Sequence, residues 1–323
     1  GVVVAISATI LAFAFSFGTS ISETGFFDVS LGQLILRFVL IFPIATILLL
    51  LGCYAASHPN LYKIKSKVVE KQITRLVPSL NVRSVLRFTA VMVLLWMPYL
   101  IALFPGSMNW DTFYQISQWY PDYHPIWLIP WAPTESYIDN AFSDHHPIFD
   151  TIIYGAFACS SDLLFGTWNY GVFAFVLLQA FGTAASMVTS IAYLERLHSP
   201  TVIRFALLLL CCFAPFFPIY AATMLKDSLF SWLYIPYLIV IVEIVRTKGD
   251  ALTRKPVLLW FFVLAILLSL TKKTGMYVVV GTAICLAIVY KAQWKALVGQ
   301  AIASLVVMCL ILPMVVFPIL DVA

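Results

Sequence analysis

Long apolar runs separated by short polar segments dominate the pattern along the chain. The runs "LGQLILRFVLIFPIATILLLLGCY" and "ALVGQAIASLVVMCLILPMVVFPIL" are typical. A helix that crosses a bilayer needs about 20 consecutive, mostly apolar residues. The pattern therefore predicts about nine membrane-spanning helices, near residues 2–18, 32–54, 88–104, 168–194, 202–222, 228–245, 256–270, 275–290 and 297–319.

The composition agrees with this prediction. Hydrophobic residues make up 62% of the 323 positions and charged residues 11%, with a mean hydropathy of +0.96, whereas soluble domains carry roughly 25% charged residues. We therefore expect an all-α, multi-pass protein of the cell membrane, with two helices and a basic loop in residues 1–87 and a larger membrane module in 88–323. The sequence lacks an initial Met and stops directly after a predicted span, which suggests missing ends.

Basic residues predict the orientation of the helices. If residues 55–87 are cytoplasmic, the alternation of spans places 195–204, 246–256 and 291–296 on the same side, and these four loops hold fifteen of the nineteen Lys and Arg residues. Cytoplasmic loops of membrane proteins are enriched in these bases. No nucleic-acid-binding motif accompanies them, so we expect no nucleic-acid partner.

The stretch from residue 105 to 167 has the opposite character. It contains seven acids and no Lys or Arg, and it is rich in aromatic residues and proline, as in "QWYPDYHPIWLIPWAP". Aromatic side chains favour the interface between membrane and water, and long loops are usually functional. We expect residues 105–167 to form an extracytoplasmic loop that carries interfacial helices.

The segment "MNWDTFYQISQ" follows a Pro-Gly break at the start of this loop. Asn109 can cap a helix in which Asp111, Gln115 and Gln118 recur at helical spacing, with their polar edge turned away from lipid. Two roles remain open for Asp111. In the first role, its carboxylate stabilises the first turn of the helix through the helix dipole. In the second, it takes part in chemistry.

A second polar cluster is "SDHHPIFD", residues 143–150. His146 and Asp150 lie one helical turn apart and can face one side of a short interfacial helix. Asp144 and His146 are weak candidates for a metal site, because the cluster lacks HxxxH or HExxH spacing. His145 points in another direction from His146. The six cysteines also lack metal-binding or redox spacing, which favours buried, unreactive thiols.

Several bases are placed against the positive-inside pattern. Lys226, next to Asp227, follows a predicted span, and Lys272 and Lys273 form a turn between two others. These side chains can pair with a nearby acid or extend into solvent. Charges near spans are costly and mark functional sites by default. Their positive sign suits a phosphate group at the outer leaflet.

The order of these segments resembles that of the GT-C membrane glycosyltransferases, in particular the family 39 group of protein mannosyltransferases and aminoarabinose transferases and related bacterial membrane proteins. The likeness lies in "MNWDTFYQ", in "HHPIFDTIIYGAFACSSDLLFG", in "LLLLCCFAPFFPIYAATMLKDSLF" and in "LLSLTKKTG". These motifs cover roughly residues 88–290. The sequence departs from the family pattern where Thr112 follows Asp111 in place of a second acid, and where the loop is longer and more aromatic.

The resemblance implies transfer of a sugar from a polyprenyl-phosphate donor to a glycan, lipid or protein hydroxyl on the extracytoplasmic face, with inversion. It implies Asp111 as the general base and Lys226, Lys272 and Lys273 as phosphate ligands. Gln115, His145, His146, Asp150 and Asp227 are the other candidates for substrate binding. No cofactor is certain, and a divalent metal is left open. Two other readings remain: a transporter or flippase with an outward-facing charged site, and a noncatalytic scaffold.

Overall fold

The computed structural model describes residues 2–24, 30–58, 66–120 and 142–322, and it divides into two compact units, Gly1–Glu70 and Lys71–Ala323. The boundary between the two units falls at Glu70, and the predicted division after residue 87 stays a prediction. Two stretches of the expected loops lie outside the described residues. They are residues 59–65 of the basic loop and residues 121–141 of the loop expected at 105–167.

The first unit is a pair of helices, α1 (Val2–Thr24) and α2 (Leu31–Ser57). Their apolar faces meet where the Phe13 and Phe38 rings lie 4.7 Å apart. The rest of α2 is covered with exposed aliphatic side chains, which suits a helix surrounded by lipid. The basic helix α3 (Lys67–Arg75) follows, and the boundary between the units falls within it.

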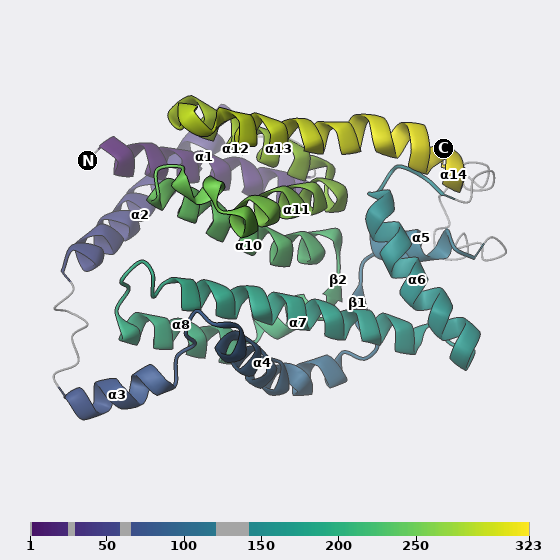
Figure 1. The fold of residues 1–323 in the computed structure, drawn as a ribbon, viewed down its shortest axis with the longest axis horizontal. Coiled ribbons are helices and arrows are strands. Elements are labelled where there is room, and N and C mark those ends of the chain that lie inside the picture. Colours follow the sequence, from purple (N-terminus) through teal and green to yellow (C-terminus); the bar gives the residue numbers. More distant parts are fainter. Residues whose placement is uncertain (1, 25–29, 59–65, 121–141, 323) are drawn as a thin grey trace. The chain divides into compact units, whose positions relative to one another are not determined.

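The second unit is a bundle in which α4 and α8 lie along one side of α7 and α10 lies along the other, with α11 packed against α10 (Figure 1). Its elements are α4 (Val82–Ala102), β1 (Ser107–Met108), α5 (Trp110–Ser117), α6 (Ile148–Phe165), α7 (Asn169–Tyr193), α8 (Thr201–Phe213), α9 (Phe216–Ala221), β2 (Thr223–Met224), α10 (Lys226–Arg246), α11 (Lys255–Thr271), α12 (Lys273–Val289), α13 (Trp294–Val306) and α14 (Phe317–Leu320). Short 3-10 helices cover Asp250–Thr253 and Lys291–Gln293, and a π-helix joins α13 to α14 over Val307–Val316.

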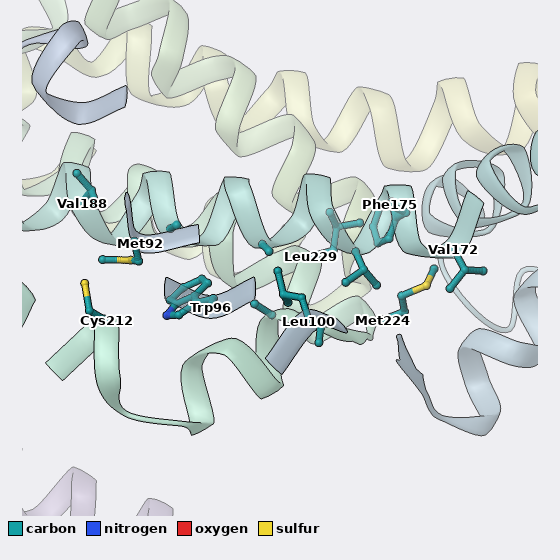
Figure 2. Close-up of a cluster of buried hydrophobic side chains, with 14 of the residues drawn as sticks. Met92, Trp96, Leu100, Val172, Phe175, Val188, Cys212, Met224 and Leu229 are labelled. Atoms are coloured by element: carbon teal, nitrogen blue, oxygen red, sulfur yellow. The ribbon is translucent and has the colours of Figure 1, made fainter. Parts of the chain in front are cut away.

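One of the two buried hydrophobic clusters of this unit includes residues of α4 and α7 (Figure 2), and the other is formed by residues of α10 to α13. Trp96 and Leu100 of α4 and Val172 and Phe175 of α7 are almost completely buried. The Trp96 indole also donates a hydrogen bond to the Cys211 carbonyl at 3.1 Å, so its polar atom is satisfied inside the apolar core. This packing holds α4 firmly against α7.

Two of the helix boundaries that differ from the sequence prediction have clear local causes. α4 begins at Val82, six residues before the predicted start at 88, because the Asn81 side chain caps it by accepting from the Ser84 amide. The helix predicted at 202–222 ends at Phe213, because Pro215 cannot continue its hydrogen-bonding pattern; α9 and β2 follow.

The described residues form an all-α membrane protein, apart from the two-residue strands. Six of the described helical segments are long and apolar enough to cross a bilayer: Leu31–Tyr54, Val82–Ala102, Ile148–Phe165, Asn169–Tyr193, Lys226–Arg246 and Lys291–Leu320. Four shorter apolar helices accompany them. One of the six, α6, lies in the stretch expected to carry interfacial helices, and Figure 1 shows it running obliquely to α7.

Candidate functional site

The two short strands place the starts of α5 and α10 next to each other. β1 and β2 pair in parallel, with both residues of each in register. Because parallel strands end at the same edge, the two helices that follow begin side by side. Asp111 is in the first turn of α5 and Lys226 is the first residue of α10. A contact between residues 115 positions apart is thus built into the backbone.

Local contacts fix this junction. Gly106 has a positive φ of 138°, and a Cβ atom at this position would lie 2.7 Å from the Val176 side chain, so only glycine fits. The Asn109 side chain caps α5 by accepting from the Thr112 amide at 3.0 Å. On the other strand, the Gln179 amide of α7 donates to the carbonyls of Ala221 and Thr223 at 2.8 and 2.9 Å. The junction is therefore anchored to the central helix.

Asp111, His146 and Lys226 form the centre of the site. The Lys226 ammonium lies 3.1 Å from Asp111 Oδ2 and 3.4 Å from His146 Nδ1. His146 Nε2 lies 3.9 Å from the other carboxylate oxygen, Oδ1. Because an ammonium can only donate, Nδ1 of His146 accepts from it, and the imidazole proton resides on Nε2, facing Asp111.

The pKa values of Asp111 and His146 are both shifted downward. Burial raises the pKa of Asp111, but the hydrogen bond and the charge of Lys226, together with the two neighbouring histidines, lower it below the ordinary value of 3.8. Burial lowers the pKa of His146, and Lys226 acts in the same direction against the effect of Asp111. At neutral pH, Asp111 is therefore an ionised carboxylate beside a neutral imidazole.

The other two lysines of the site also meet acids from distant segments. Lys272 pairs with Asp227 in the first turn of α10. Lys273 lies 3.0 Å from the Asp144 carboxylate and 2.6 Å from the Asp144 carbonyl. Both lysines come from the tight turn between α11 and α12, where a Cβ on Gly275 would lie 2.2 Å from the Leu268 carbonyl. The glycine is what allows this turn to close.

Together these contacts link four segments into one cluster, the lysine ring. The segments are the start of α5, the start of α10, the turn between α11 and α12, and residues 144–146. Each of the three lysines has one aspartate partner, so the formal charges within the ring cancel. The lysine side chains are between 28% and 52% exposed, so solvent and ligands can reach them. His145 is exposed beside this ring, and its imidazole packs edge-on against His146.

Gln115 and Asp150, both expected to contact substrate, are buried. The Gln115 amide donates to the Thr151 hydroxyl at 3.0 Å, which ties α5 to α6. Asp150 is 0% exposed, and neither of its carboxylate oxygens has a hydrogen-bond partner among the described residues. The structure does not place it against His146. Gln118 also faces the protein, where its carbonyl oxygen accepts from the Ser143 amide. These side chains position the segment that carries His146.

The residues present do not fit a divalent metal. Among the described residues, no three His, Cys, Asp or Glu side chains come together as a ligand set. Of the two weak candidates, Asp144 is paired with Lys273, and the Nδ1 lone pair of His146 is directed at an ammonium. A cation is a poor neighbour for a second cation, so these lysine contacts disfavour a divalent metal at Asp144 and His146.

A second charged cluster was not anticipated from the sequence. The Glu243 carboxylate, near the end of α10, is only 6% exposed and binds the guanidinium groups of Arg196, Arg246 and Arg254 at 2.9 to 3.1 Å. Its other oxygen accepts from the Tyr193 hydroxyl at 2.7 Å. An isolated acid in an apolar helix, three residues before an arginine, was the available signal.

Comparisons with curated proteins and with solved structures give no significant match. A family model does match, over residues 2–322, and so covers the helices of both units and every residue of the site. On that match, the chain belongs to DUF6020, a family of unknown function.

Proposed function

We propose that this protein is a membrane glycosyltransferase that moves a sugar from a polyprenyl-phosphate donor to an acceptor hydroxyl. One observation carries the proposal: an ionised carboxylate, Asp111, stands within a ring of three lysines at the ends of apolar helices. A lipid-linked sugar phosphate needs this combination. Its chain requires an apolar surface, its phosphate requires positive charge, and the attacking hydroxyl requires a base.

Asp111 acts as the general base. The acceptor O–H bond breaks and its proton passes to the carboxylate, while the acceptor oxygen forms a bond to the anomeric carbon. The bond between that carbon and the phosphate oxygen breaks on the opposite face, which inverts the centre, and polyprenyl phosphate leaves. Lys226 keeps Asp111 ionised before the reaction, and His146 orients the carboxylate through the Nε2 side of its ring. A positioned base contributes typically 10² to 10⁴ in rate.

The lysines stabilise the leaving group. As the glycosidic bond breaks, a phosphodiester with one negative charge becomes a phosphomonoester that gains a second. Lys272 and Lys273 are bound to one aspartate each and are partly exposed, so a phosphate can share or replace those partners. Charge placed where it develops in the transition state is usually the largest contribution to catalysis.

An apolar cavity offers a place for the lipid chain. It has a volume of about 630 Å³ and lies between α7, α10 and α11, where its described lining includes Phe181, Trp232, Trp260 and no charged residue. Trp232 follows Lys226 by six residues, roughly 9 Å along the helix at 1.5 Å per residue. A Cβ on Gly182 would lie 2.6 Å from the Trp232 ring, so this glycine makes room for one wall. We assign the prenyl chain to this cavity.

The same proposal includes the orientation and the nine spans expected from the sequence, with the lysine ring on the extracytoplasmic face. The Glu243 cluster then lies at the cytoplasmic end of α10. His145→Cys should react with an impermeant thiol reagent on intact cells, whereas Thr253→Cys should react only after lysis. The opposite pattern would contradict the orientation. Ser136, in the same expected loop, lies outside the described residues.

Release of polyprenyl phosphate tests the function directly. The purified protein, supplied with synthetic farnesyl-phosphoryl mannose, glucose and arabinose and with an acceptor mixture, should release farnesyl phosphate from at least one donor. Proteoliposomes provide the comparison with a transporter. Movement of the donor or of a solute across the bilayer, without sugar transfer, would replace the enzyme by a flippase or transporter. If the protein shows neither sugar transfer nor transport, a noncatalytic scaffold is the remaining function.

A further inference from the structure

A second cavity lies where α5 and α6 end and α7 begins. Its volume is about 420 Å³, within the lower part of the range of small-molecule sites, about 300 to 1,000 Å³. The described residues that line it are Ser117, Tyr120, Asp162, Gly166, Thr167 and Trp168. They include one carboxylate, three hydroxyl groups and two aromatic rings, but no base. This lining differs from both the lysine ring and the apolar cavity.

Asp162 is the only charged side chain among these lining residues. Within the described part of the chain, its carboxylate has no ion pair and no hydrogen bond. A carboxylate accepts several hydrogen bonds and donates none, so it selects a ligand with hydroxyl or amine donors and repels a phosphate. The Thr167 hydroxyl oxygen accepts from the Asn169 amide, which leaves its proton free to bond a ligand.

The aromatic residues supply an apolar surface beside these polar groups. Trp168 packs edge-on against Phe113 of α5, with ring centroids 5.8 Å apart, which holds the indole in place. The buried Tyr120 hydroxyl lies beside the Cys159 thiol; burial, then Cys159, then Asp162 raise its pKa, so it stays neutral. An indole beside hydrogen-bonding groups suits a molecule that has both C–H faces and hydroxyl groups.

The loop that forms the cavity is held rigidly. The Ser161 hydroxyl donates to the Thr167 carbonyl at 2.6 Å, and Gly166 ends α6 with a left-handed φ of 67°. A Cβ on Gly171 would lie 1.9 Å from the Phe157 carbonyl oxygen, so α6 and α7 approach closely directly below the loop. The cavity is therefore a preformed feature of the packing between these two helices.

We propose that this cavity binds a neutral saccharide and is the subsite for the acceptor, which is then a glycan. This inference rests on the proposed glycosyl transfer. Among the described lining residues, the combination of hydroxyl groups, one unpaired carboxylate, an indole and no base matches a neutral polyol better than a phosphate or a lipid. Asp111 and Ser117 stand at opposite ends of α5, roughly 9 Å apart along its axis. A short oligosaccharide held in the cavity can therefore extend a hydroxyl to the general base.

Saccharide binding to the purified protein tests the inference without requiring turnover. The probes are chitotriose, mannotriose, maltotriose and arabinotriose, followed by saturation-transfer NMR and calorimetry. We expect at least one to bind equally to the wild type and to Asp250→Asn, a change at an exposed site, and to bind about tenfold more weakly to Asp162→Asn, because a hydrogen bond to a charged group is lost. Thr167→Val provides a second variant if Asp162→Asn does not fold.

The outcomes separate this inference from the proposed function. Saccharide binding that depends on Asp162, in a protein that transfers no sugar, would support the cavity and refute the enzyme. Sugar transfer with an unchanged acceptor KM in Asp162→Asn and Thr167→Val, or an absence of binding by all four probes, would overturn the cavity assignment alone. Binding of spermidine in place of every saccharide would identify an amine site and also overturn it.

Discussion

Two charged clusters stand at opposite ends of α10, a helix of 21 residues and so about 32 Å long. At its C-terminal end, one carboxylate, Glu243, is 6% exposed and is shared by three arginines and a tyrosine. At its N-terminal end, Lys226 has one carboxylate partner, and the side chains of that pair are 28% and 37% exposed. The first cluster is closed around its acid, whereas the second is open to solvent.

The two clusters differ in how readily their charges can change partners. Planar guanidinium groups bind a carboxylate through directed hydrogen bonds, and removing a buried partner leaves charges uncompensated. A lysine is a flexible point charge, and an exposed pair with aspartate is worth about 0 to 1 kcal/mol. The Glu243 cluster therefore anchors the end of α10, while the lysine ring can exchange an aspartate for a substrate phosphate at little cost.

The largest expected effect follows Asp111→Asn. The amide keeps the size of the side chain but not its basicity, so sugar transfer should fall by roughly 10² or more while the protein stays folded. Asp250→Asn, the same change at an exposed site, should leave turnover unaltered. Near-normal transfer with stability lowered by about 0.3 to 1 kcal/mol would instead show that Asp111 only interacts with the helix dipole.

Glu243→Gln should produce the next largest effect. It should lower the stability of the protein and leave catalysis unchanged. Three guanidinium groups lose their shared charge, and hydrogen bonds to charged groups are worth about 1.5 to 3 kcal/mol, so we expect a loss of that order. Glu195→Gln is a matched control, because that carboxylate is 52% exposed and pairs only with Arg204 among the described residues. Equal melting temperatures for the two variants in detergent would show that the buried Glu243 cluster stabilises the protein no more than the exposed Glu195 carboxylate does.

The sequence predicted the members of the lysine ring better than their pairing. Asp111, Lys226 and Lys272 stand out because charged residues are rare beside apolar spans. Which lysine meets which acid depends on the pairing of β1 with β2 and on the turn at Gly275, and neither has a pattern that hydropathy can detect. The expected contact between His146 and Asp150 rested on helical spacing alone.

Helix positions were predicted well, and the failures have local causes. "APFFP", where α8 ends, is as apolar as the helix before it, so hydropathy alone continued the span through Pro215. Glu243 was not singled out from the sequence, because two of its three arginine partners, Arg196 and Arg254, come from other segments of the chain. The burial of Gln115 could not be predicted either, since the polar edge of α5 faces α6 and not water.

Lys226→Met should change the pH dependence of transfer. Burial raises the pKa of Asp111, while Lys226 foremost, and then His146 and His145, lower it below 3.8 in the folded protein. Asp111 therefore stays ionised to low pH. The stability that its ionised form contributes to the folded protein is lost as pH falls through this lowered pKa. Without Lys226, burial remains and the acid limb of turnover should move to higher pH. A profile of kcat that keeps its acid limb in place would show that Lys226 does not control the ionisation of Asp111.

Asp144→Asn should change stability least among these substitutions. The pair of Asp144 with Lys273 has an oxygen–nitrogen distance of 3.0 Å, close to the 2.9 Å of Glu243 with Arg254, yet its side chains are 41% and 52% exposed. Water screens exposed charges, and ordering two flexible side chains costs entropy, so stability should change by less than about 1 kcal/mol. Thermal unfolding in low and high salt measures this, and the small difference from wild type should shrink as salt rises. A loss as large as that of Glu243→Gln, and insensitive to salt, would mean that the lysine ring is a closed structural cluster like the one at the other end of α10, and that its lysines are not available to a phosphate.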